Sequence, residues 1–205
     1  MQNVEIKAEL RDIDLARELL RAIQASKIGV LRQTDTYYRV AEGRFKKREA
    51  ELDGMREPVE FIHYTRADLA RPRLSHFKIY AEEQAREHFG MLAIGAGADF
   101  EASESATAPA HPGTLPVWVI VRKVRELWMV GNVRVHLDQV ESLGTFIELE
   151  ALVSTSQHVG KCHEAIAELR AHLSPVMGEF IVSSYADMMA VHIESEPRPM
   201  LPPPA

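Results

Sequence analysis

Polar and apolar residues alternate along much of this chain, which is typical of β-strands with one buried face. Residues 3–10 (NVEIKAEL) follow this period strictly. It returns at 117–130 (VWVIVRKVRELWMV), 133–140 (VRVHLDQV) and 145–153 (TFIELEALV), with charged residues gathered on one face. Repeated over at least six strands, the pattern predicts a barrel with a charged interior and an outer wall covered by helices.

Helical spacing of apolar residues appears at 13–25 and at 157–173. The first of these helices follows Asp12, a residue type that caps helix N-termini well. Both segments repeat leucine or isoleucine at the three- and four-residue spacing that packs one helix face on a core. We therefore expect structural helices outside the barrel, with Cys162 buried in their packing.

A row of basic residues follows the segment QTDTYYRV. Residues 33–49 predict a turn, a strand, a glycine-containing corner and a second strand. On that second strand Arg44, Lys46 and Arg48 share one face, about 7 Å apart. Such a row repels itself unless an anion lies against it, and phosphate oxygens are usual partners of these groups. We expect a polyanion site in which Lys46 has no acidic partner. The alternatives are a solvated strand face, or pairing of Lys46 to an acid such as Glu148.

The composition limits the classes of protein that this chain can be. Its 205 residues are 46% hydrophobic, which suits a single domain, predicted over residues 1–193. Residues 92–116, rich in Ala, Gly, Ser and Pro, predict a flexible loop insertion, and residues 194–205 predict a disordered Pro-rich tail. The net charge of −6 argues against a nucleic-acid partner, and no apolar run could span a membrane. With one cysteine and no signal-peptide core, we expect a cytoplasmic protein.

The charged strand faces indicate what the barrel could hold. Enclosed charges are costly unless they are paired, and pairing explains part of the pattern. Basic and acidic residues are nevertheless separated along the sequence, which favours a cationic wall for phosphates beside an acidic wall for a hard divalent cation. The candidate inward cations are Lys7, Arg44, Lys46, Arg48, Arg66, Lys123, Arg125 and Arg134, and the candidate inward acids are Glu5, Glu9, Asp138, Glu148 and Glu150.

The ordered set of segments resembles the CYTH family of triphosphate tunnel metalloenzymes, named for class IV adenylyl cyclases and thiamine triphosphatases. The matching pieces are VEIKAEL, QTDTYYRV followed by GRFKKRE, YTRAD, PRLSHF, VRKVREL, VRVHLDQVESLGTFIELE and SSYADMM, which together span residues 3–189. The resemblance implies an α+β fold, mainly antiparallel β, built on an eight-stranded barrel. The barrel is a tunnel that binds a triphosphate together with Mg²⁺ or Mn²⁺.

The resemblance also implies roles for individual residues. The phosphate-binding residues would be Lys7, Arg44, Lys46, Arg48, Lys123, Arg125 and Arg134, to which the inward-facing Arg66 is added, and the metal ligands would be Glu5, Asp138, Glu148 and Glu150. Lys7, Arg48 and Lys123 are the predicted catalytic residues. One departure concerns the opening motif ExExK, where this chain has Asn3 in the first position. An amide oxygen can bind a hard cation but brings no charge, so one metal position is open to question.

Three functions fit these residues. In a class IV adenylyl cyclase-like reaction, ATP would form cyclic AMP and pyrophosphate; the cyclase-like segments QTDTYYRV, LGTFIELE and SSYADMM favour this one. The alternative is a triphosphatase that hydrolyses tripolyphosphate, thiamine triphosphate or a nucleoside triphosphate. A non-catalytic polyphosphate-binding module would not need Glu148 and Glu150, so it is the least favoured. Tyr185 would either touch the substrate or close one tunnel end. A monomer and a homodimer both remain open.

Overall fold

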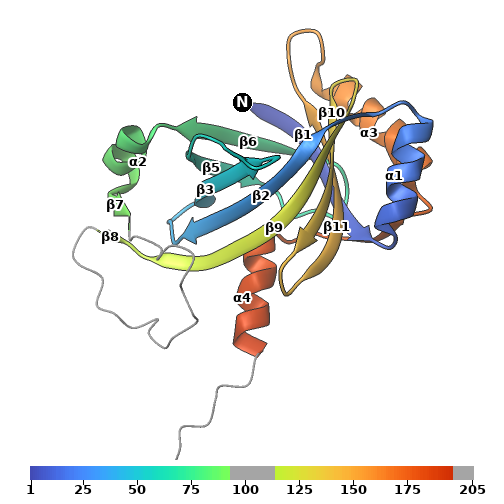
Figure 1. Cartoon of the computed structure of the whole chain (residues 1–205). Helices are drawn as coiled ribbons and strands as arrows, with labels where there is room; N and C mark the ends of the chain where they lie inside the picture. The colour runs from blue at the N-terminus through green and yellow to red at the C-terminus, as the bar shows by residue number, and fades with distance from the viewer. Residues whose placement is uncertain (93–113, 196–205) are drawn as a thin grey trace, which may run out of the picture.

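The computed structural model describes residues 1–92 and 114–195 (Figure 1). The predicted loop at 92–116 and tail at 194–205 lie almost wholly outside these residues. The helices are α1 (Ile13–Ala22), α2 (Glu82–Phe89), α3 (Val159–Leu173) and α4 (Tyr185–Ser195). The strands are β1 (Gln2–Leu10), β2 (Ser26–Tyr38), β3 (Arg44–Leu52), β4 (Met55–Arg56), β5 (Glu60–Arg66), β6 (Arg73–Tyr80), β7 (Met91–Leu92), β8 (Thr114–Leu115), β9 (Val117–Val130), β10 (Val133–Val140), β11 (Gly144–Leu152) and β12 (Met177–Phe180).

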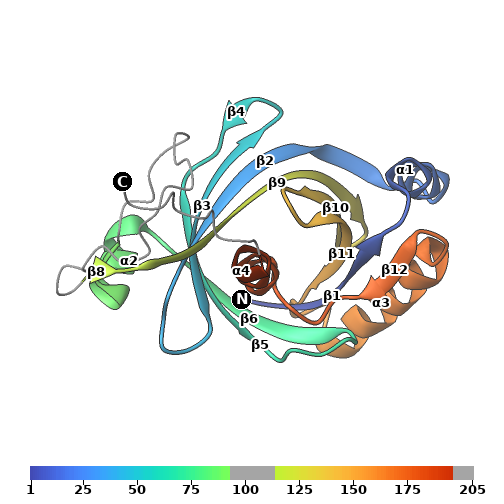
Figure 2. The same cartoon turned by 90° about the horizontal axis from the view of Figure 1, so that it is seen from below.

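Eight long strands close into an antiparallel barrel (Figure 2). Their order is β11, β10, β9, β2, β3, β5, β6 and β1, and β1 then pairs with β11 to complete the ring. The predicted fold class is therefore confirmed. Among the described residues, no helix is both long and apolar enough to cross a lipid bilayer.

The alternation along β1 separates the inside of the barrel from its outer wall. Val4 and Ile6 are fully buried on the outer face, within a core to which α1 contributes Leu20 and α3 contributes Ile166. Glu5 and Lys7 point the other way and pair in register with Glu150 and Glu148 of β11. The predicted helices thus cover the outer wall, and Asp12 caps α1 by accepting hydrogen bonds from two backbone amides, as expected.

The turn predicted at Gln33 is wrong. Strand β2 begins at Ser26, so Gln33 lies in its middle, paired with Ala50 of β3 and Lys123 of β9. Strands β3 and β9 flank β2 and supply hydrogen-bond partners for its backbone amides and carbonyls. This pairing outweighs the turn preference of a Thr-Asp sequence. As a consequence, Asp35 and Tyr37 share the interior face with the basic row of β3.

Helix α4 closes one end of the barrel (Figure 2). Tyr185, Ala186 and Met189 of this helix are buried against apolar interior side chains that include Val121 and Phe146. The Tyr185 hydroxyl donates a hydrogen bond to Asp138 at 2.8 Å. Of the two roles considered for Tyr185, closing the tunnel is therefore the one seen in this conformation, and a ligand would have to enter from the opposite end.

Candidate active site

Three interior cations converge on one buried carboxylate. Asp35, which is 1% exposed, accepts hydrogen bonds from Lys46 Nζ at 2.9 Å, Lys123 Nζ at 2.7 Å and Arg48 Nε at 2.7 Å. The expectation that Lys46 lacks an acidic partner is therefore wrong, although the partner is Asp35 and not Glu148. A turn at Gln33 gives Asp35 no defined strand face, so the sequence does not indicate Asp35 as a site residue; strand β2, which includes Asp35, places it inside the barrel.

One carboxylate cannot balance three cations, and the protonation of the cluster reflects this. Burial would raise the pKa of Asp35, but Arg48, Lys123 and Lys46 hold that pKa well below its usual range. Burial, followed by repulsion from Arg48, lowers the pKa of Lys46 to about 7. Burial also lowers the pKa of Lys123. The two lowered lysine pKa values therefore reflect three basic groups around one acid, and an entering anion would stabilise the charged ammonium forms.

A second cluster joins cations and acids that the sequence had placed on separate walls. Arg125 donates to both oxygens of Asp138 at 2.6 Å and to Glu148 at 3.0 Å. Burial lowers and Asp138 raises the pKa of Arg125, and the net change is upward. The predicted division into a cationic and an acidic wall is thus not kept in this conformation. Cross-strand pairing brings Arg125 and Asp138 together, because β9 and β10 form a hairpin in which these positions are partners.

Lys7 lies between the charged interior and α4. Its Nζ is 3.7 Å from the centroid of the Tyr185 ring, a cation–π distance. Burial lowers the pKa of Lys7 to about 8, while attraction to Glu148 opposes the change. Near neutral pH this amine can therefore both hold and release a proton.

Two arginines on the β5 and β6 side have unused donors. Arg66 binds the Glu5 carboxylate directly, and Arg73 Nε lies 3.6 Å from it. In each arginine, Nε and Nη2 are buried without a hydrogen-bond partner among the described residues. Arg73 was not among the predicted site residues, although its alternation with Ser75 places it on the interior face. Unsatisfied buried guanidinium donors are suited to phosphate oxygens.

The remaining predicted residues lie nearer the barrel ends. Arg44 faces α4, where it donates to Asp187 at 2.7 Å. Arg134 is 41% exposed and lies 3.6 Å from Glu150. Glu9, still paired in register with Phe146 of β11 near the end of β1, is exposed, which removes it from the interior acids. The structure brings together most predicted cations in one interior and leaves Arg44 and Arg134 at its edges.

Several side chains of the predicted metal site, with carboxylate and amide oxygens, lie near Glu150. Glu5 and Glu150 are direct cross-strand partners, an arrangement that repels unless a cation lies nearby. Asn3 binds Glu150 through its amide nitrogen, while its Oδ1 is buried without a partner among the described residues. His136 was not among the predicted site residues. Its Nδ1 lies 3.4 Å from Glu148 Oε2, and its Nε2 lies 3.7 Å from Glu150 Oε2. The donor set fits a hard cation.

The fit has limits in this conformation. No group of three or more His, Cys, Asp or Glu side chains in residues 1–92 and 114–195 is already arranged to hold a metal ion. Asp138 is fully buried, and its oxygens are occupied by Arg125 and Tyr185. Its metal role stays a prediction that requires these contacts to open.

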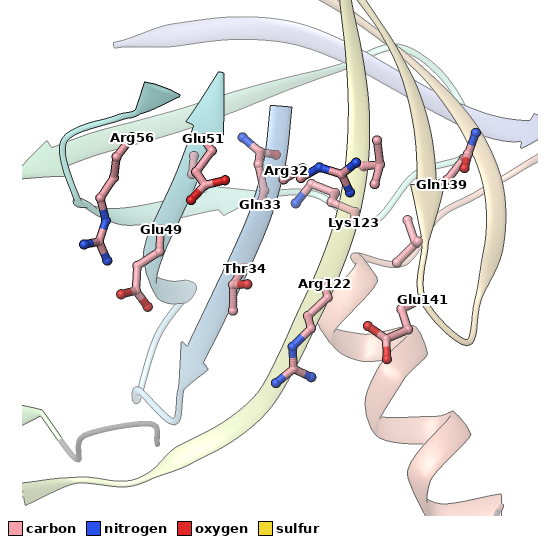
Figure 3. A pocket seen from close by; sticks show the side chains of 13 residues that line it. Arg32, Gln33, Thr34, Glu49, Glu51, Arg56, Arg122, Lys123, Gln139 and Glu141 are labelled. Atoms are coloured by element: carbon pink, nitrogen blue, oxygen red, sulfur yellow. The ribbon is translucent and has the colours of Figure 1, made fainter. Parts of the chain in front are cut away.

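A groove of about 570 Å³ lies outside the barrel wall (Figure 3). Arg32 and Thr34 pair in register with Glu51 and Glu49, and these positions alternate with the interior ones on β2 and β3. Arg122 lines the same groove from β9. Its arginine and glutamate side chains are more exposed than the charged side chains of the interior, so we assign the chemistry to the interior.

A charged interior within an eight-stranded barrel defines the class of a triphosphate tunnel protein, and comparison identifies the family. The CYTH domain matches residues 1–185, so the chain belongs to the CYTH family. CYTH proteins are enzymes that act on triphosphates and depend on divalent metals. No curated protein matches the chain.

Solved structures share the fold at low sequence identity. The PH1819 protein of Pyrococcus horikoshii is 19% identical, with a TM-score of 0.59 over 95% of this chain and 99% of that one. A protein of Vibrio parahaemolyticus, provisionally assigned as an adenylate cyclase, is 15% identical, with a TM-score of 0.61 over 92% and 97%. HpAC1 of Hippeastrum, a provisional adenylyl cyclase with a dominant triphosphatase activity, is 14% identical, with a TM-score of 0.50 over 96% and 98%.

Proposed function

We propose that this protein is a divalent-metal-dependent enzyme acting on a triphosphate in its tunnel, with cyclisation of ATP as the preferred reaction. The cluster of Lys46, Arg48 and Lys123 on Asp35 carries the proposal, because one carboxylate serves three basic groups and the oxygens of a bound anion would stabilise their charged forms. Arg66 and Arg73 add buried donors that have no hydrogen-bond partner within residues 1–92 and 114–195. These side chains would share the oxygens of three consecutive phosphates.

The interior residues can take distinct roles in cyclisation. The ribose 3′-oxygen would form a bond to the α-phosphorus, the bond to the bridging oxygen would break, and pyrophosphate would leave. Lys7, with its pKa lowered to about 8, is suited to accept the proton of the 3′-hydroxyl. Arg48 and Lys123 would turn from Asp35 to the phosphate oxygens and stabilise the charge that develops on them.

A divalent cation would be held by Glu5, Glu148, Glu150 and the free Asn3 oxygen, and when bound it neutralises phosphate charge. Mg²⁺ and Mn²⁺ both suit an oxygen-rich set with one histidine nearby. The number of ions stays open, since Asn3 brings no charge.

Hydrolysis is the second candidate. The same interior would direct water to the terminal phosphorus of tripolyphosphate, thiamine triphosphate or a nucleoside triphosphate. The structural likeness to HpAC1, in which triphosphatase activity is dominant, supports hydrolysis as the alternative reaction.

Product identification tests the proposal. Purified protein is incubated with ATP, tripolyphosphate or thiamine triphosphate, each with Mg²⁺ or Mn²⁺. Cyclic AMP with pyrophosphate would support the cyclase, and orthophosphate would support the triphosphatase. Binding without turnover of any of the three would indicate a non-catalytic polyphosphate-binding module and overturn the proposal.

A further inference from the structure

Aliphatic side chains lie on the interior face of the barrel, beyond the charged residues. On β2, Leu31 pairs in register with Leu52 of β3 and with Arg125 of β9, which places all three on the interior face. On β9, Leu127 follows Arg125 by two positions and therefore shares that face. We call Leu31, Leu52 and Leu127 the aliphatic rim.

The rim lies away from the end that α4 closes. Tyr37 and Val119, which pack with α4, are register partners near one end of the β2–β9 pair. Leu31 is six positions from Tyr37 along β2, about 20 Å at 3.3 Å per residue. The charged interior, with Asp35 and Lys123, lies between them. The rim is therefore at the end from which a ligand would enter.

The rim side chains are not used by the folded core. In the described part of the chain three apolar cores form, under α1 and α3, around α4 and beneath α2, and no rim residue belongs to any of them. Leu31, Leu52 and Leu127 are partly exposed. Aliphatic surface that faces the charged interior lacks the burial that normally stabilises it.

We infer that the aliphatic rim binds the organic group of the substrate, so that the enzyme prefers an organic triphosphate over inorganic tripolyphosphate. This inference rests on the proposed function. Its basis is continuity with the phosphate site, because Lys123, Arg125 and Leu127 follow one another on one strand face at about 7 Å intervals. A ligand with phosphates at Lys123 and Arg125 would place its ester group against Leu127 and Leu31. Tripolyphosphate has no group that could cover them.

Calorimetric titration of two matched variants tests the inference. Leu127→Ser removes a rim side chain, and Leu15→Ser makes the same substitution at an exposed leucine on α1, outside the barrel. The probes are ATP, thiamine triphosphate and tripolyphosphate, each with Mg²⁺. We expect Leu127→Ser to weaken the binding of at least one organic triphosphate about tenfold and that of tripolyphosphate less than twofold. Leu15→Ser should change none of the three.

Contrary outcomes distinguish a failure of the rim assignment from a failure of the proposed function. Equal loss for all three probes, or no loss in Leu127→Ser, would overturn the rim as a specificity site while leaving the tunnel function in place. Leu31→Ser repeats the test on the neighbouring strand if Leu127→Ser does not fold. Wild-type protein that binds none of the three probes would contradict the proposed function itself, and the rim assignment with it.

Discussion

Lys123 Nζ lies 2.7 Å from Asp35 Oδ2, although 88 residues separate the two in the sequence. Lys46 and Arg48 share the same carboxylate, so an internal acid occupies the place where we expect phosphate oxygens to bind. When no ligand is bound, the Asp35 carboxylate therefore offsets the electrostatic repulsion among the three cations. A bound triphosphate would take over part of this role.

Replacement of Asp35 measures how much the fold depends on this counter-ion. Asp35→Asn should destabilise the empty protein by about 3–5 kcal/mol, the usual range when one member of a buried charge network is removed. Tripolyphosphate should raise the melting temperature of this variant more than that of wild type, because its oxygens replace the lost carboxylate. Thermal melts with and without tripolyphosphate check both expectations.

A double variant controls for general damage at this position. Asp35→Asn combined with Lys46→Met should melt above Asp35→Asn alone, because one of the unbalanced cations is gone. A double variant that melts below the single variant would show that Asp35 supports the barrel by packing and not by charge.

The lysines predict opposite pH responses for stability and for binding. Burial lowers the pKa of Lys46 from 10.5 to about 7 and that of Lys7 from 10.5 to about 8. Between these values and pH 10.5 the unfolded chain holds protons that the folded chain has released. The lysine contribution to stability should therefore rise with pH across that window. Affinity for tripolyphosphate should instead fall about 10- to 100-fold between pH 6.5 and 9, as the ammonium charges are lost.

Lys46→Arg is the control, because arginine keeps its charge over this range. Its affinity for tripolyphosphate should depend less on pH than that of wild type. Wild-type affinity that stays constant or increases up to pH 9 would exclude charged lysines as phosphate ligands.

The acids of β11 should matter for turnover more than for the fold. Glu148→Gln combined with Glu150→Gln should reduce turnover at least about 100-fold, because the metal loses two charged ligands. Arg125 still has Asp138 as a partner, so the variant should remain folded. The matched control is Glu49→Gln combined with Glu51→Gln, a pair at the same spacing on the outer face of β3. Equal activity in both double variants, or full activity with excess chelator, would contradict a metal site at Glu148 and Glu150.

The alternation of polar and apolar residues is enough to predict the barrel, because at least six strands have one charged and one apolar face. It failed where both faces are polar or aromatic. In β2 the run Thr34, Asp35, Thr36 and Tyr37 gives no periodic signal, so the interior position of Asp35 could not be recognised. Pairing with β3 and β9 decides that position, and it depends on residues far away in the sequence.

The contacts between charged side chains also could not be predicted from the order of the residues along the chain. Basic and acidic residues separated along the chain become neighbours across strands, as Arg125 and Asp138 do. Counting outward from the turn at Gly131 and Asn132 would have paired these two positions. Arg73 and His136 could similarly have been placed inside by the parity of their strands, but their roles depend on neighbours from other strands.

Calorimetric titration with ATP and AMP, both with Mg²⁺, tests the central claim that the tunnel binds a triphosphate. If the interior cations share three phosphates, ATP should bind at least about 100-fold more tightly than AMP, and the difference should shrink at high salt as the charges are screened. Equal affinities of ATP and AMP for the wild-type protein would contradict the claim.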